Sequence, residues 1–151
     1  MRLCLLTWLC LIVTATGFAE TWPQLPEKDG TIEIPVQEWP LKPGPRTVRV
    51  TVRYPQGKLS AVQASTGVML TLHNWGGTDC VGTAAPQVLA ERYSVIALCV
   101  NYLQSGAEEG VKGPEPYDFG YLQALDALRA LWLVEFHLEE ARTPWASGRI
   151  F

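Results

Sequence analysis

The chain has 151 residues, of which 48% are hydrophobic and 18% are charged, and this is the composition of one ordinary globular domain. Such a composition excludes a disordered, a fibrous and a multi-span membrane protein. The formal net charge is -3 and the sequence contains no basic run, so we expect no nucleic-acid partner.

The first nineteen residues have the three parts of a secretory signal. Arg2 precedes an apolar run over residues 3–13, and small residues at Gly17 and Ala19 mark a cleavage site. The run is much shorter than a membrane span, which needs about 20 residues. We therefore expect cleavage after Ala19, a secreted or periplasmic mature chain, and no stable membrane span. The alternative is an uncleaved N-terminal anchor.

The segment after the signal is predicted to be an exposed lead-in followed by two strands. Residues 20–30 are rich in proline and turn formers. Hydrophobic and polar residues then alternate over residues 31–37 and again over residues 46–54, which is the pattern of half-buried strands. Prolines between the two segments cannot donate to a strand ladder, so they separate the strands. The two segments are predicted to form an antiparallel pair.

Two nearly continuous apolar runs, residues 68–72 and 95–100, indicate strands that are covered on both faces, as in a parallel sheet with helices on each side. Between them, residues 84–92 are predicted to be a helix, with Thr83 as its N-cap and Pro86 in its first turn. A strand, a crossover helix and a second strand make a βαβ unit. The expected fold class is therefore α/β.

The strongest helix prediction covers residues 118–140, after a glycine- and proline-rich loop over residues 103–116. Asp118 is the predicted N-cap, and Tyr117 and Leu122 are predicted to form a hydrophobic staple around it. The apolar stripe of this helix is predicted to be core, and the opposite face to meet solvent. The stripe consists of Leu125, Leu128, Trp132 and Phe136, and the polar face consists of Gln123, Asp126, Arg129, Glu135 and Glu139.

A segment with two consecutive glycines, His73-Asn74-Trp75-Gly76-Gly77, directly follows the first of the two apolar strands. Glycine allows backbone conformations and close approaches that side chains block. A loop at this place can direct backbone N–H groups into a cleft at the carboxyl end of the sheet, where they stabilise a developing oxyanion. Taken alone, the glycine pair is equally compatible with an ordinary tight turn.

The runs VMLTLHNWGG, VIALCVNYLQSG and YDFGYLQALDALRALW resemble the first half of a bacterial α/β-hydrolase, nearest to the esterase and prolyl-oligopeptidase-like branches. The resemblance implies that residues 31–151 are an incomplete α/β-hydrolase domain, with an antiparallel strand pair followed by parallel βαβα units. It also implies an oxyanion loop in which the Trp75 N–H is the donor and Gly76 the next candidate. His73, Asn74 and Gly77 then have structural roles in this loop, and Asn74 stands where the family usually has glycine.

The same family requires a nucleophile elbow, G-x-S-x-G, followed by an acid and a histidine. The sequence contains no such motif, and residues 149–151 fall where the buried strand that leads to it is expected to begin. We therefore interpret the chain as the N-terminal fragment of a secreted serine hydrolase of a small ester or peptide substrate, truncated before its nucleophile elbow and inactive alone. The alternatives are a non-catalytic secreted binding domain and a structural half completed by a second polypeptide. Self-association through an uncovered sheet, with poor solubility, is also expected.

The sequence offers no substitute for the missing catalytic residues. Ser65, Ser94 and Ser105 are interpreted as having no nearby histidine to activate them. His137 is interpreted as a surface or helix-terminal residue, and Glu108 with Glu109 as a solvated acidic pair.

Two cysteines, Cys80 and Cys99, follow the signal. An exported chain permits a disulfide between them, but two small buried residues are the favoured interpretation. Together with His73 and His137 they lack the local spacing of a zinc site, so we expect no metal and no cofactor.

Overall fold

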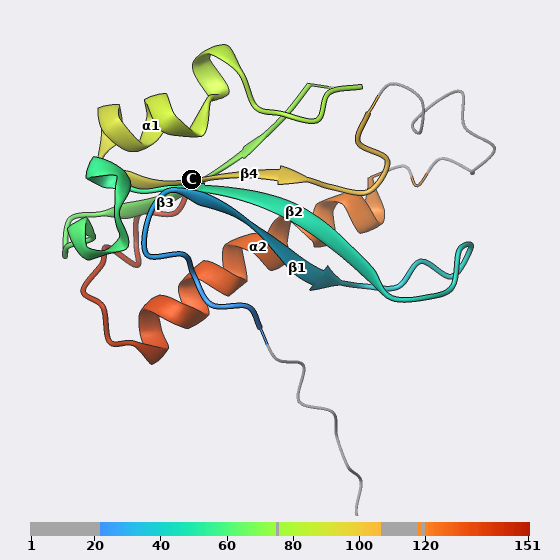
Figure 1. Ribbon diagram of the computed structural model, residues 1–151, viewed down its shortest axis with the longest axis horizontal. Coiled ribbons are helices and arrows are strands. Elements are labelled where there is room, and N and C mark those ends of the chain that lie inside the picture. The colour runs from blue at the N-terminus through green and yellow to red at the C-terminus, as the bar shows by residue number, and fades with distance from the viewer. Residues whose placement is uncertain (1–21, 75, 107–117, 119) are drawn as a thin grey trace, which may run out of the picture.

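A computed structural model describes residues 22–74, 76–106, 118 and 120–151. Within these residues a mixed sheet of four strands lies between two helices (Figure 1), which confirms the α/β class. The strands are β1 (Gly30–Val36), β2 (Arg46–Arg53), β3 (Gly67–Leu72) and β4 (Val95–Asn101). The helices are α1 (Pro86–Tyr93) and α2 (Tyr121–Glu140), with short 3-10 turns η1 (Pro55–Gly57), η2 (Leu59–Ala61) and η3 (Gly82–Ala84).

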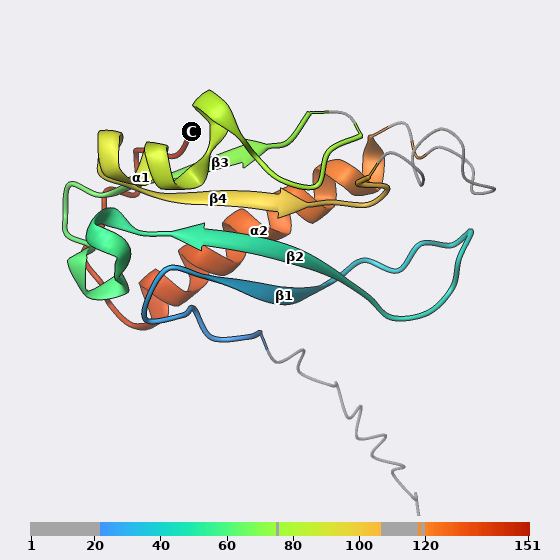
Figure 2. The ribbon, with the colours of Figure 1, turned by 45° about the horizontal axis from the view of Figure 1, so that its top comes forward.

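The strands lie in the order β1-β2-β4-β3. β1 pairs with β2 and β2 with β4 in antiparallel fashion, whereas β3 and β4 are parallel. Figure 2 shows α1 on one face of this sheet and α2 on the other. The structure thus confirms both the predicted antiparallel pair and the predicted strand-helix-strand unit.

The core begins with the alternating residues of β2. Val48, Val50, Val52 and Tyr54 are all buried, as the alternation predicted, and opposite them in β1 lies Ile34. Each fully buried side chain of this size contributes roughly 1.5–3 kcal/mol by the hydrophobic effect. Burial also raises the pKa of Tyr54, and the nearby negative charge of Asp29 raises it further.

β3 and β4 differ in burial, although the sequence predicted that both strands are covered on both faces. β4 is buried from Val95 to Val100, because it has a strand on each side and a helix over each face. In β3, Val68 is buried but Leu72 is 50% exposed. On the side of β3 away from β4, the only described residues that pair with it are 149–151: the Val68 N–H donates to the Arg149 carbonyl at 2.9 Å, and Ile150 forms a parallel bridge with Val68. Residues 149–151 therefore pair with β3 where the sequence predicted a buried strand, but through one isolated bridge, and Ile150 and Phe151 are 40% and 59% exposed.

α2 begins at Tyr121, three residues later than predicted, but Asp118 still acts on its first turn. The Asp118 carboxylate accepts the N–H groups of Leu122 and Gln123 at 2.7 and 3.2 Å. These are among the N–H groups that a helix start leaves without intrahelical partners. The other predicted staple residue, Tyr117, lies outside the described residues.

The prediction that the apolar stripe of α2 is core is wrong. Leu128, Trp132 and Phe136 are 56%, 51% and 41% exposed. The helix contacts the sheet through a different face, and small side chains on that face allow it to pack closely against the strands. This buried face comprises Leu122, Asp126, Ala127, Ala130, Leu133, Val134, His137 and Leu138.

Two smaller predictions also change. Thr83 lies in η3, and the N-cap of α1 is Ala85, which makes no side-chain capping bond, although Pro86 occupies the first turn as predicted. The lead-in is not simply exposed, because Leu25 is buried in the core.

No helix among the described residues is long and apolar enough to cross a membrane. The predicted signal lies outside those residues.

Candidate functional site

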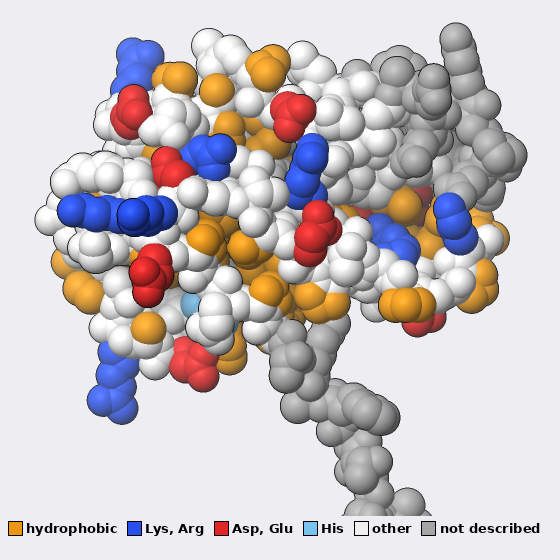
Figure 3. All heavy atoms as spheres, viewed as in Figure 1, with side chains coloured by type: hydrophobic (Ala, Val, Ile, Leu, Met, Phe, Trp, Pro, Cys, Tyr) orange, Lys and Arg blue, Asp and Glu red, His pale blue; other side chains and the backbone are white. Residues whose placement is uncertain are grey.

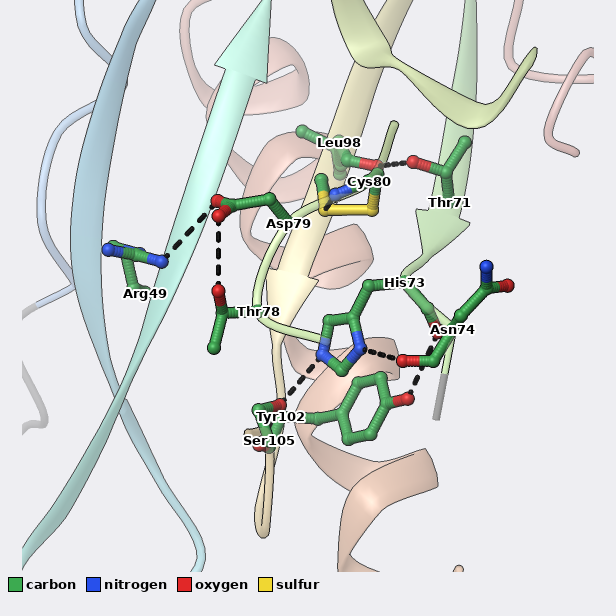
Figure 4. Close-up of a disulfide and its surroundings, with 11 residues drawn as sticks. Arg49, Thr71, His73, Asn74, Thr78, Asp79, Cys80, Leu98, Tyr102 and Ser105 are labelled. Carbon is green, nitrogen blue, oxygen red and sulfur yellow. Dashed lines mark hydrogen bonds and ion pairs between the residues drawn. A yellow bond between two sulfur atoms is a disulfide. The ribbon is translucent and has the colours of Figure 1, made fainter. Parts of the chain in front are cut away.

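The segments after β3 and β4 meet at one edge of the sheet. Because the two strands are parallel neighbours, their carboxyl ends lie together, and this is where open α/β sheets bind ligands. His73 and Asn74 follow β3, and Tyr102 to Ser105 follow β4. Figure 4 shows the side chains of Tyr102 and Ser105 beside the His73 ring, with the Asn74 carbonyl oxygen facing one ring nitrogen.

The glycine pair forms a tight turn. The Gly77 N–H donates to the Asn74 carbonyl at 2.8 Å, and Gly76 has a φ of 75°, in the left-handed region that favours glycine. A Cβ at position 77 would lie 3.0 Å from the Asn74 carbonyl oxygen. Trp75, whose N–H is the predicted donor, lies outside the described residues.

A pocket of about 310 Å³ opens beside this turn. No residue among those described accepts a hydrogen bond from the Gly76 N–H. The pocket is lined by Leu72, His73, Asn74, Gly76, Gly77, Asp79, Val81 and Ala84. Two larger pockets, of about 630 and 400 Å³, are lined by residues that precede β3 and by residues at the end of α2 or after it, away from the carboxyl ends of β3 and β4. The pocket of about 310 Å³ is therefore the one that adjoins the glycine-pair turn after β3, where a ligand is expected to bind.

His73 is buried and bound on both ring nitrogens. Its Nδ1 lies 2.9 Å from the Asn74 carbonyl oxygen, and its Nε2 lies 2.7 Å from Ser105 Oγ. The ring stacks on Tyr102 with centroids 4.3 Å apart, and the Tyr102 hydroxyl donates to the His73 carbonyl at 3.3 Å. These contacts join the loop after β3 to the loop after β4.

The interpretation that Ser105 has no nearby histidine is wrong. The two residues are 32 positions apart in the sequence, and only the parallel pairing of β3 with β4 brings them together. A further bond, from the Gly106 N–H to the Gly77 carbonyl at 3.0 Å, holds the two loops side by side. Sequence spacing carries no signal for such a contact.

Cys80 and Cys99 form a disulfide, so the favoured interpretation of two free buried cysteines is wrong. Their Cα atoms are 6.0 Å apart, because the loop after β3 passes over β4 before α1 begins. The Cys80 N–H also points to the Cys99 sulfur, at 3.1 Å. The disulfide fixes the far end of the loop that carries His73 and the glycine pair.

Asp126 is fully buried, and its place on the predicted polar face of α2 is therefore also wrong. Its Oδ2 accepts the Leu103 N–H at 2.9 Å and pairs with Arg46 at 2.7 Å. Burial raises the pKa of Asp126, and the Leu103 N–H and the Arg46 guanidinium offset this only in part. Asp126 thus anchors the loop after β4 to α2.

His137 lies in the last turn of α2, as one of its two predicted placements had it, and not on the surface. It is buried, with Nε2 2.8 Å from the Pro23 carbonyl oxygen. The described part of the chain contains no group of three His, Cys, Asp or Glu side chains placed to hold a metal ion. Glu108 and Glu109 lie outside it.

No family model, no curated protein and no solved structure matches the chain. Its function is therefore argued from the geometry of the site at the carboxyl ends of β3 and β4.

Proposed function

We propose that residues 31–151 are the oxyanion-loop part of a secreted serine hydrolase of the α/β-hydrolase type, acting on a small ester or a peptide bond. The observation that carries the proposal is the Gly76 N–H, which has no acceptor among the described residues and belongs to a turn that lines a pocket. An N–H group in this position stabilises the negative oxygen that forms when a carbonyl is attacked.

The arrangement of the strands supports the proposal. An antiparallel pair is followed by two parallel strands, and the loop leaves the carboxyl end of β3, as the resemblance to α/β-hydrolases implies. Residues 149–151 begin to pair in parallel on the open side of β3. A hydrolase of this type carries its nucleophile on the turn after the next strand, so the resemblance places the nucleophile, acid and base of the proposed enzyme after Phe151.

The disulfide supports the export part of the proposal. Disulfides persist in oxidising compartments and are rare in reducing ones. The Cys80–Cys99 bond lies in the same loop as the proposed donor, so it both fits a secreted enzyme and holds the site.

The donor role of Gly76 is tested by NMR on the chain labelled with ¹⁵N-glycine. A tetrahedral anion such as a monoalkyl butylphosphonate resembles the transition state of ester hydrolysis. We expect its addition to shift the Gly76 amide resonance, which the Gly76→Ala spectrum identifies, because the phosphonate oxygen accepts this N–H.

Gly57 is the matched control, since its φ of 72° is nearly that of Gly76 and it lies in η1, at the other end of the molecule. Its resonance should not move, and Gly57→Ala should leave phosphonate binding unchanged. A phosphonate that shifts other resonances but not that of Gly76 would overturn the donor role. Binding at Gly76 by a full-length protein that hydrolyses no ester or peptide would instead favour a non-catalytic binding domain.

A further inference from the structure

Ser105 and His73 have the geometry of a nucleophile and its base. The Ser105 hydroxyl oxygen lies 2.7 Å from His73 Nε2, within the hydrogen-bond reach that proton transfer requires. Each residue lies just beyond the carboxyl end of a strand, and those strands are parallel neighbours. Ser105 is partly exposed, whereas the histidine is buried beneath it. Ser105 is therefore the member of the pair that is open to solvent.

The second ring nitrogen fixes the tautomer. Nδ1 lies 2.9 Å from the Asn74 carbonyl, and a carbonyl oxygen only accepts hydrogen bonds, so in the neutral ring Nδ1 carries the proton. Nε2 then presents its lone pair to the Ser105 hydroxyl. In serine hydrolases a carboxylate orients the base in this way. Here the carbonyl does so, and the same oxygen is fixed by the Gly77 N–H at 2.8 Å.

The backbone before Ser105 is strained. Gln104 is a buried non-glycine residue with a φ of 62°, a left-handed conformation that costs roughly 1–2 kcal/mol. The turn is closed by the Ser105 N–H, which donates to the Tyr102 carbonyl at 3.1 Å, and the Gln104 side chain accepts the Asp118 N–H at 3.1 Å. Strain of this kind persists where surrounding contacts impose it, and it concentrates at active sites.

The Ser105 hydroxyl has two acceptors for its one proton. Its oxygen lies 2.6 Å from the Tyr102 carbonyl oxygen as well as 2.7 Å from His73 Nε2. Only the imidazole nitrogen has the basicity to remove that proton, because a peptide carbonyl does not become protonated near neutral pH. In the resting state the one hydroxyl proton is shared between the Tyr102 carbonyl and His73 Nε2, and His73 takes it when the oxygen attacks.

We infer that Ser105 and His73 form an acyl-transfer site of their own within this chain, with Ser105 as nucleophile, His73 as base and a short-chain ester as substrate. This inference is independent of the proposed function, which does not use Ser105 as its nucleophile. His73, which contacts Ser105, lines the pocket of about 310 Å³, and Leu72, Val81 and Ala84 give part of that pocket an aliphatic wall suited to a short acyl group.

The reaction needs no cofactor. Ser105 Oγ attacks the carbonyl carbon of the ester while its proton passes to His73 Nε2. The bond to the alcohol oxygen breaks, the alcohol leaves with that proton, and the acyl group stays on Ser105. Water then adds to the acyl carbon and gives a proton to Nε2; the acid departs as this proton returns to Ser105 Oγ.

The test uses a biotinylated fluorophosphonate, which forms a covalent adduct with activated serines, and peptide mapping by mass spectrometry on the unmodified chain. We expect the adduct at Ser105. Ser105→Ala should abolish labelling and p-nitrophenyl acetate hydrolysis, whereas Ser60→Ala, an exposed serine in η2, should leave both unchanged. Loss of the base in His73→Gln should slow labelling by about 10²–10⁴-fold.

Because the adduct is mapped on the unmodified chain, the outcome does not depend on how a variant folds. An unlabelled Ser105 in the folded chain would overturn the inference, and so would labelling that is equally fast in His73→Gln; the pair would then only join the two loops. The Gly76 response to phosphonate requires no adduct at Ser105, so failure of one proposal leaves the other standing.

Discussion

Asp126 shows how much a single buried charge contributes to this fold. It has no exposed surface, yet it joins three parts of the chain: α2, the start of β2 through Arg46, and the loop after β4 through the Leu103 N–H. Removing one partner of such a buried pair costs more than the pair itself contributes, because a charge is left without compensation. The stability of the candidate site therefore depends on a residue that takes no part in its chemistry.

Asp126→Ala should lower the free energy of unfolding by roughly 3 kcal/mol, since it leaves the Leu103 N–H without an acceptor and the Arg46 guanidinium without its carboxylate partner, with only the Gln37 carbonyl among the described residues still bound to it. Asp126→Asn should cost less, because an amide oxygen can still accept the Leu103 N–H. Urea unfolding of the two variants and of the unmodified chain measures both losses of stability. Equal losses in the two variants would show that the side-chain oxygen is not the anchor.

The contribution of Asp126 to the stability of the fold should change with pH in one direction. The pKa of Asp126 is raised above its ordinary value of 3.8, so the folded state binds the proton more tightly than the unfolded state. The stability that this group contributes is fully present below pH 3.8 and is lost as the pH rises through the raised pKa. The unmodified chain should therefore lose stability relative to Asp126→Asn across this window in urea titrations. A difference that stays constant with pH would contradict the shift.

At the scale of elements, the segment between β3 and α1 is held at both ends. His73 and the Asn74–Gly77 turn fix its beginning, and the Cys80–Cys99 disulfide fixes its end to β4. The cysteines are 19 residues apart, and a disulfide that closes a loop of this length restricts the unfolded chain. The short helix α1 alone contributes little to holding the segment, because it has eight residues and no side-chain N-cap bond.

Cys80→Ser and Cys99→Ser together should lower the free energy of unfolding by about 3 kcal/mol, the value for a loop of about this size. Cys80→Ser alone should cost nearly as much, because either substitution removes the bond. Guanidinium unfolding measures the loss, and hydrogen exchange should show faster exchange of the Gly77 amide. An unchanged unfolding midpoint after reduction would mean that the disulfide does not hold this loop.

At the scale of the whole molecule, one surface is more apolar than a monomer usually presents. Leu128, Trp132 and Phe136 are exposed along α2, and Figure 3 shows hydrophobic side chains at the surface over the region of β1 and α2. Trp22 covers part of this stripe through an edge contact with Trp132, at 5.2 Å between ring centroids. Exposed apolar patches of this kind commonly mark a contact surface.

We expect the chain to self-associate through this stripe more than through the sheet edge, because residues 149–151 already pair with the first half of β3. Leu128→Lys with Trp132→Lys should shift sedimentation toward the monomer and raise solubility. Val81→Lys with Tyr93→Lys changes exposed apolar residues elsewhere and is the control. If Leu72→Lys at the edge has the larger effect, the sheet edge is the contact.

The sequence by itself determined the kinds and order of the elements. Alternation over β1 and β2 and the continuous apolar run of β4 are local patterns, and each element formed within a few residues of its predicted bounds. The loop with the glycine pair was also found from the sequence, because glycine at a left-handed position is a local requirement. These features depend on residues that are close to one another in the sequence, so the sequence alone reveals them.

Only the tertiary structure decided which residues meet. The Ser105–His73 contact, the disulfide and the burial of Asp126 join residues that lie far apart in the sequence, and each depends on the register of β3 beside β4 or on the rotation of α2 over the sheet. The rotation could not be read from hydrophobicity alone, because α2 has apolar residues on two faces, and the face that is buried also carries the polar residues Asp126 and His137.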